Sequence, residues 1–140
     1  MSEPIARAEG QKHLTGGCLC GHVKFKVDGS MREIVACHCS QCRKQSGNFL
    51  ASSDAKATDV TFLETSGLKW FKSSDKAERG FCQDCGSVLF WRSVDSDMIS
   101  ITAGSLDGKT GLKICEHIYV ADKPDWYEIT DGIKQYQIWR

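Results

Sequence analysis

Apolar and polar residues alternate along short segments of this chain, the period-2 pattern of half-buried β-strands. The clearest case is residues 20–27, where Phe25 and Val27 share one face and Lys24 and Lys26 share the other. Shorter apolar runs bounded by Gly, Asp or Ser predict further strands at residues 34–37, 48–51, 60–63, 68–71, 77–81, 88–92, 98–102 and 113–120. The pattern therefore predicts a mainly β protein.

Helical periodicity is weak throughout. Residues 40–46 and 106–110 predict short helical turns, but no stretch sustains the i, i+3, i+4, i+7 pattern of a longer helix. Residues 1–13 are polar and patternless, so we expect a loose N-terminal arm followed by a single domain over residues 14–140. A chain of 140 residues fits one domain, since domains commonly hold about 100–200 residues.

Charge and hydropathy exclude several function classes. The chain has 18 Lys and Arg against 18 Asp and Glu, so it lacks the basic footprint of a general nucleic-acid binder. No apolar run approaches the roughly 18 residues of a membrane span, and the N-terminal residues lack the apolar segment of a secretory signal. We therefore expect a cytoplasmic protein with no membrane partner, and nucleic acid is not an expected partner.

The unusual feature of the composition is eight cysteines, seven of which are clustered. The clusters are Cys18-Leu19-Cys20, Cys37-His38-Cys39-Ser40-Gln41-Cys42 and Cys82-Gln83-Asp84-Cys85, whereas Cys115 stands alone. In a reducing compartment, clustered cysteines are more often metal ligands than disulfides. The sulfur atoms around a tetrahedral zinc ion lie about 3.8 Å from one another, a spacing that Cys-x-x-Cys turns allow. The clusters therefore predict zinc binding.

The simplest partition joins the two cysteine pairs into one closed four-sulfur site, formed by Cys18, Cys20, Cys82 and Cys85. The cysteines that remain are Cys37, Cys39 and Cys42. Structural zinc sites are closed, whereas catalytic sites keep three protein ligands and one open position. The count therefore suggests one site of each kind.

A second partition is also open at this point. Cys115 or His38 could complete a second closed site, in which case both zinc ions would be structural. His38 lies between two strand-like ligands, so its side chain is expected to point away from them. His117 shares a strand face with Cys115 and is expected to be a buried, hydrogen-bonded histidine.

Beyond the cysteines, several stretches form a recognisable set. They are Gly16-Gly17-Cys18-Leu19-Cys20-Gly21 with Val23 and Phe25, Cys37-His38-Cys39-Ser40-Gln41-Cys42-Arg43-Lys44 with Gly47, Arg79 with Phe81-Cys82-Gln83-Asp84-Cys85-Gly86-Ser87, Gly104-Ser105-Leu106-Asp107, and His117-Ile118-Tyr119-Val120 with Lys123 and Trp126. From about Thr15 to Trp126, the chain resembles the glutathione-dependent formaldehyde-activating (Gfa) family, which also includes centromere protein V.

The resemblance implies a zinc-stabilised β-tent (Mss-four-like) fold of several small coiled antiparallel sheets with few short helical turns. It also implies two Zn²⁺ sites. The site matching Cys18, Cys20, Cys82 and Cys85 is structural in that family, and the site matching Cys37, Cys39 and Cys42 is catalytic. The family activity is formation of S-(hydroxymethyl)glutathione from formaldehyde and glutathione, classed as a carbon–sulfur lyase in the reverse direction.

We therefore expect a zinc-dependent carbon–sulfur lyase that forms or cleaves hemithioacetal adducts of a small thiol, with glutathione the leading substrate. The metal at the three-cysteine site is expected to be the more labile of the two. Arg43 and Lys44 follow that cluster and are expected to pair with substrate carboxylates. Arg79 is expected to pack its stem on the Cys-x-x-Cys turn, and Asp107 to form a turn. The alternative is a non-catalytic, zinc-braced module that binds a protein or nucleic-acid partner.

Overall fold

The structure is a computed structural model, and it describes residues 5, 6 and 13–140. Most of the expected N-terminal arm at residues 1–13 lies outside the described residues. His13, the last residue of that range, is the first residue of a strand.

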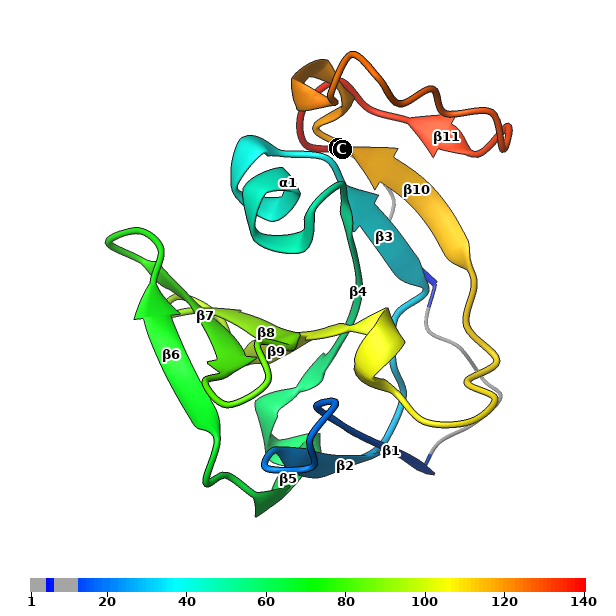
Figure 1. Ribbon diagram of the computed structural model, residues 1–140. Coiled ribbons are helices and arrows are strands. Elements are labelled where there is room, and N and C mark those ends of the chain that lie inside the picture. The colour runs from blue at the N-terminus through cyan, green and yellow to red at the C-terminus, as the bar shows by residue number, and fades with distance from the viewer. Residues whose placement is uncertain (1–4, 7–12) are drawn as a thin grey trace.

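The described residues form a mainly β fold with eleven strands, one α-helix and three short 3-10 turns (Figure 1). The strands are β1 His13–Gly17, β2 Lys24–Asp28, β3 Ile34–Cys37, β4 Leu50–Lys56, β5 Val60–Glu64, β6 Leu68–Lys72, β7 Ala77–Cys82, β8 Val88–Ser93, β9 Met98–Thr102, β10 Ile114–Ile118 and β11 Lys134–Gln135. The helix is α1 Ser40–Ser46, and the 3-10 turns are Ala57–Asp59, Ala103–Ser105 and Val120–Asp122. Within the described part of the chain, no helix has the length and apolar character needed to cross a bilayer.

The strands pair into two sheets. Strands β1, β2 and β5 form a small antiparallel sheet, and the other eight follow the order β11-β10-β3-β4-β9-β8-β7-β6. The larger sheet is antiparallel except at β10, which is parallel to both β3 and β11. Figure 1 shows β4 running from the end that carries α1, β3 and β10 to the end that carries the small sheet. The β-tent expectation is confirmed, with eight strands joined continuously and β10 adding parallel pairing.

The core lies where the small sheet packs against β8 and β9. Phe25 and Val27 of β2 are buried, and the intervening lysine is exposed, as the alternating pattern predicted. The rings of Phe25 and Phe90 meet edge to face at 5.1 Å between centroids. Each fully buried side chain of this size contributes about 1.5–3 kcal/mol of transfer free energy. Cys82 belongs to the same buried cluster, so one metal-ligand candidate is part of the core.

Helix α1 is short because its caps are close together. The Sγ atom of Cys39 accepts a hydrogen bond from the backbone N–H of Cys42 at the N-terminal end. Gly47 ends the helix in the left-handed conformation at φ 95°, and its N–H donates to the carbonyl of Arg43. Glycine takes this conformation without a Cβ clash. Cys39 and Gly47 therefore set the two ends of α1.

The helical turn predicted at residues 106–110 is wrong. A 3-10 turn lies just before it at Ala103–Ser105, and Leu106 forms an isolated β-bridge with Gly16. A side chain at Gly16 would come within 2.5 Å of the Phe25 ring and 2.6 Å of the Ser105 carbonyl oxygen. The absence of a side chain at Gly16 therefore lets this segment approach β1, a tertiary contact that local periodicity could not reveal.

Candidate metal centres

The first cysteine cluster joins two distant turns. Cys18 and Cys20 follow β1, Cys82 ends β7, and Cys85 lies in the turn after it. The Sγ atoms of Cys18 and Cys20 are 3.6 Å apart, and those of Cys20 and Cys82 are 3.7 Å apart. All four sulfurs lie within 4.8 Å of one another. Tetrahedral zinc with Zn–S bonds of about 2.3 Å separates its sulfurs by about 3.8 Å, so this cluster fits zinc.

The surroundings of Cys85 favour its thiolate form. The Ser87 hydroxyl hydrogen-bonds Cys85 Sγ at 3.3 Å, and together with the Ser87 backbone N–H it lowers the pKa of Cys85 to about 5. The thiolate is the form of cysteine that binds metal. The Cys-x-x-Cys turn is closed by hydrogen bonds from Gly86 N–H to the Cys82 carbonyl and from Cys82 N–H to the Ser87 carbonyl. The four donors are therefore held by two backbone turns.

The second cluster contains three sulfurs. Cys37 ends β3, Cys39 caps α1, and Cys42 lies buried in the first turn of that helix. Their Sγ atoms also lie within 4.8 Å of one another. The Cys37 and Cys42 side chains lower the pKa of Cys39 to about 2, whereas the Cys39 and Cys42 side chains raise the pKa of Cys37. Three thiolates this close repel one another, so a bound cation is needed for all three to ionise.

No fourth donor joins this second cluster from the described residues. Cys115 lies outside both clusters, and the His38 side chain is hydrogen-bonded to His117 instead of joining Cys37 and Cys39. The partition in which Cys115 or His38 completes a second closed site is therefore not the arrangement found. A sulfur-only donor set suits zinc, and the fourth position of this cluster is not taken by a described side chain.

His38 belongs to a buried hydrogen-bonded chain that sequence reasoning did not foresee. Its Nε2 lies 2.9 Å from Nδ1 of His117, and Nε2 of His117 lies 2.8 Å from Oδ2 of Asp131. A carboxylate only accepts, so His117 donates from Nε2, and its Nδ1 then accepts from His38 Nε2–H. The imidazole of His38 also packs against the rings of Phe49 and Tyr127, which contact each other. His117 is buried and hydrogen-bonded as predicted, and the chain holds the backbone between Cys37 and Cys39 in place.

The buried imidazole of His38 should make stability depend on pH. Burial, with His117 adding to it, lowers the pKa of His38 from 6.5 to about 4. The unfolded chain then binds more protons than the folded one between these values, so the free energy of unfolding falls as the pH drops through that window. We expect wild type to lose more stability from pH 6.5 to 4 than His38→Phe, measured by urea denaturation of the zinc-loaded proteins. Equal slopes for the two proteins would contradict this account, because cysteine protonation affects both alike.

Arg79 lies elsewhere than expected. It was expected to pack on the Cys-x-x-Cys turn, but its guanidinium reaches α1, where Nη1 and Nη2 each lie 3.6 Å from Sγ of Cys42. Arg79 is close to Cys82 in the sequence but 37 residues from Cys42. Local sequence therefore gave no indication of the contact between Arg79 and Cys42. Of the two expected substrate cations, Lys44 is exposed and Arg43 is half-buried at the C-terminal end of α1.

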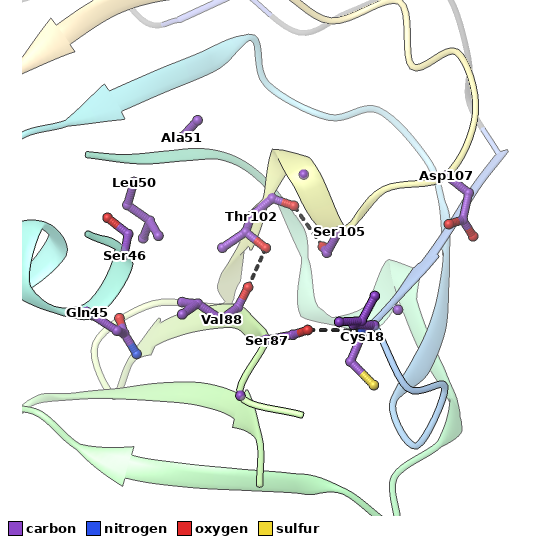
Figure 2. Close-up of a pocket in the computed structure, with 14 residues that line it drawn as sticks. Cys18, Gln45, Ser46, Leu50, Ala51, Ser87, Val88, Thr102, Ser105 and Asp107 are labelled. Carbon is purple, nitrogen blue, oxygen red and sulfur yellow. Dashed lines mark hydrogen bonds between the residues drawn. The ribbon is translucent and has the colours of Figure 1, made fainter. Parts of the chain in front are cut away.

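A cavity of about 740 Å³ opens beside Cys18 of the first cluster (Figure 2), and none of Cys37, Cys39 and Cys42 is among its lining residues. Cys18 lies on one side of it, and Gln45 and Ser46 of α1 lie on the other. Neither Arg43 nor Lys44 is among its lining residues. The lining residues are Gly17, Cys18, Leu19, Gln45, Ser46, Leu50, Ala51, Gly86, Ser87, Val88, Thr102, Gly104, Ser105 and Asp107.

Asp107 is the acidic side chain of this lining. Its Oδ2 accepts a hydrogen bond from the Thr15 hydroxyl at 2.9 Å, and its backbone N–H donates to the Thr15 carbonyl at 2.8 Å. These two bonds fix the carboxylate at the edge of the cavity. Sequence reasoning had expected it to form a turn.

Comparisons with known proteins identify a family and several relatives. The profile of a family described as glutathione-dependent formaldehyde-activating enzyme matches residues 13–122. A Schizosaccharomyces pombe protein named as an uncharacterized lyase is 28% identical over 125 residues, covering 88% of this chain and 90% of the relative. A Halomonas elongata protein provisionally named as a glutathione-dependent formaldehyde-activating enzyme is 29% identical over 134 residues, covering 83% of this chain and 80% of the relative.

A solved structure supports the fold. The crystal structure of a Rhodobacter sphaeroides protein matches with a TM-score of 0.59 at 20% identity, covering 69% of this chain and 90% of that chain. The profile match spans most of the chain and includes both cysteine clusters. The chain therefore belongs to the glutathione-dependent formaldehyde-activating enzyme family.

Proposed function

We propose that this protein is a zinc-dependent carbon–sulfur lyase that forms or cleaves S-hydroxymethyl adducts of glutathione or a similar small thiol. The observation that carries the proposal is the three-sulfur cluster of Cys37, Cys39 and Cys42, which no further donor joins from the described part of the chain. Gln45 and Ser46 of the same helix line a cavity large enough for a small molecule. The lyase and family names of the relatives support the reaction class.

The two clusters would divide the work. Four sulfurs complete a tetrahedral site, and Cys82 is fully buried in the core, which supports a structural role for Cys18, Cys20, Cys82 and Cys85. Three sulfurs leave a coordination position for a substrate, which supports a catalytic role for the second cluster. We infer zinc at both, since all seven donors are cysteine sulfurs.

The chemistry needs a thiolate and a carbonyl carbon side by side. Zinc bound by Cys37, Cys39 and Cys42 would supply a position that accepts the substrate sulfur and favours its thiolate form. In the forming direction, the sulfur adds to the carbonyl carbon of formaldehyde and one C–S bond forms. The C=O π pair moves to oxygen, which takes up the proton that the thiol released. Atoms and electrons balance, and cleavage reverses the same steps.

The cavity would hold the rest of the thiol. Ser46, Thr102 and Ser105 line it. Their hydroxyls donate to backbone carbonyls of the chain, so their oxygens would accept from peptide N–H groups of the ligand. The carboxylate of Asp107 would attract the ammonium group of glutathione. We still propose Arg43 and Lys44 as partners for the carboxylates of glutathione. They lie in the last turn of α1 and do not line the cavity. The eight cysteines are all free, and a reducing cytosol would keep them so.

Two measurements test the proposal together: native mass spectrometry, and ¹H NMR exchange spectroscopy of glutathione and its formaldehyde adduct. We expect two zinc ions per chain, with millimolar glutathione joining or displacing only one of them. We also expect the protein to accelerate exchange between free glutathione and its formaldehyde adduct. S-methylglutathione, which has no thiol, is the matched control and should leave both metals unchanged. Two zinc ions indifferent to glutathione, with no accelerated exchange, would support the non-catalytic binding module instead.

A further inference from the structure

The side chain of Arg79 is buried without a carboxylate partner. It is 6% exposed, and no ion pair involves it among the described residues. A buried charge is costly unless it is paired and hydrogen-bonded. Its neighbours are instead the amide oxygens of Gln45 at 2.9 Å and Gln41 at 3.2 Å, and the sulfur of Cys42. The negative charge that balances this guanidinium must therefore come from the cysteine cluster.

The position of the guanidinium is set by rigid elements. Arg79 lies inside β7, opposite Phe71 of β6 on one side and Trp91 of β8 on the other. The side-chain amide of Gln41 donates to the Ser73 carbonyl at 3.4 Å, which turns its oxygen toward the guanidinium. In this position, Nη1 and Nη2 of Arg79 both contact Sγ of Cys42.

We propose that Arg79 is a positioning residue of the three-cysteine metal site, which fixes the sulfur of Cys42 and offsets the excess charge of the site. Three thiolates around one Zn²⁺ leave one negative charge in excess, and one buried guanidinium neutralises it. This inference rests on the metal site of the proposed function. It adds that the zinc affinity of the three-cysteine site depends on a residue of β7, the strand that also carries Cys82 of the four-cysteine cluster.

Metal affinity, rather than enzyme activity, tests the inference. Competition with a chromophoric zinc chelator resolves the tighter and the weaker site, and Co²⁺ substitution reports the thiolate environment of each by its charge-transfer absorption. We expect Arg79→Gln to weaken the weaker site by about 10- to 100-fold, the usual cost of losing a group that supports a metal ligand. The tighter site should keep its affinity. Arg79→Lys, which keeps the charge but not the fork, should fall in between.

Arg92 supplies the matched control. It lies on the neighbouring strand β8, pairs with Glu78 and stacks over Trp70, and no hydrogen bond joins it to a cysteine sulfur among the described residues. Arg92→Gln and Arg92→Lys should leave both affinities at the wild-type value. Unchanged affinity of the weaker site in the Arg79 variants would overturn the inference. Equal weakening of both sites with a lowered melting temperature would also overturn it, because that result marks a general structural role.

The experiment separates this inference from the proposed function. If wild type binds two zinc ions and the Arg79 variants retain both affinities, only the role of Arg79 falls. If wild type binds a single zinc ion, the open metal site falls and this inference falls with it. Should Arg79→Gln fail to fold, the comparison of Arg79→Lys with Arg92→Lys decides. A lower zinc affinity of the weaker site in Arg79→Lys would support the inference. Equal affinities in the two variants would overturn it.

Discussion

The Cys82→Ser variant is expected to lose its tightly held zinc ion and its cooperative unfolding transition together. Cys82 is fully buried, and its sulfur lies 3.7 Å from that of Cys20. Structural zinc contributes about 10–16 kcal/mol of binding free energy in small zinc domains. That is as large as the whole free energy of unfolding of an ordinary domain, about 5–15 kcal/mol. A serine oxygen is a poor substitute for a thiolate ligand, so most of this stabilisation should be lost.

Circular dichroism melts and zinc content of the same sample measure this effect. Cys115→Ser is the matched control, because Cys115 lies outside both clusters and its loss should cost no metal. The physical reason for the large effect is the topology of the site. It ties the turn after β1 to the turn after β7, which also meet through Leu19 N–H on the Ser87 hydroxyl at 3.0 Å and through His22 and Asp84 at 2.8 Å, both at exposed positions. A Cys82→Ser protein that melts cooperatively near the wild-type temperature would show that this cluster is not structural.

The Cys42→Ser variant is expected to lose activity while the domain stays folded. Its sulfur is one of three donors, so the second zinc should bind far more weakly. Loss of a supporting group alone typically costs about 10- to 100-fold in metal affinity, and loss of a direct ligand should exceed the upper end of that range. Exchange of formaldehyde with glutathione should therefore fall by more than about 100-fold. The core around Phe25 and Phe90 does not involve this cluster, so folding should persist.

Zinc stoichiometry, the melting curve and the exchange assay should be read on one preparation. One zinc ion per chain, a cooperative transition and no glutathione effect are the expected results. The pair of serine variants then tests the division of labour directly, because Cys82→Ser and Cys42→Ser each remove one sulfur from a different cluster. Equal unfolding by both would contradict the separation into a structural and a catalytic site.

Local pattern was sufficient where the physical cause is local. Phe25 and Val27 alternate with lysines because successive residues of a strand face opposite sides, and β2 lies there. The caps Cys39 and Gly47 bound α1 within the short segment predicted to be helical. The strand β1 was missed because its two glycines, Gly16 and Gly17, carry no hydrophobic signal. Strand β11 has only two residues, too few for any periodicity.

The sequence by itself determined the three local groups of cysteines, because Cys-x-Cys and Cys-x-x-Cys turns bring their sulfurs close whatever the rest of the fold does. The tertiary structure decided which groups join, since Cys20 and Cys82 are 62 residues apart. Only the tertiary structure decided what surrounds them. Arg79 lies 37 residues from Cys42, and His38 lies 79 residues from His117. Contacts at such separations are set by how the sheets pair and bend, which no local periodicity records. The metal donors were therefore readable from the chain, whereas the groups that orient and balance them emerged from packing.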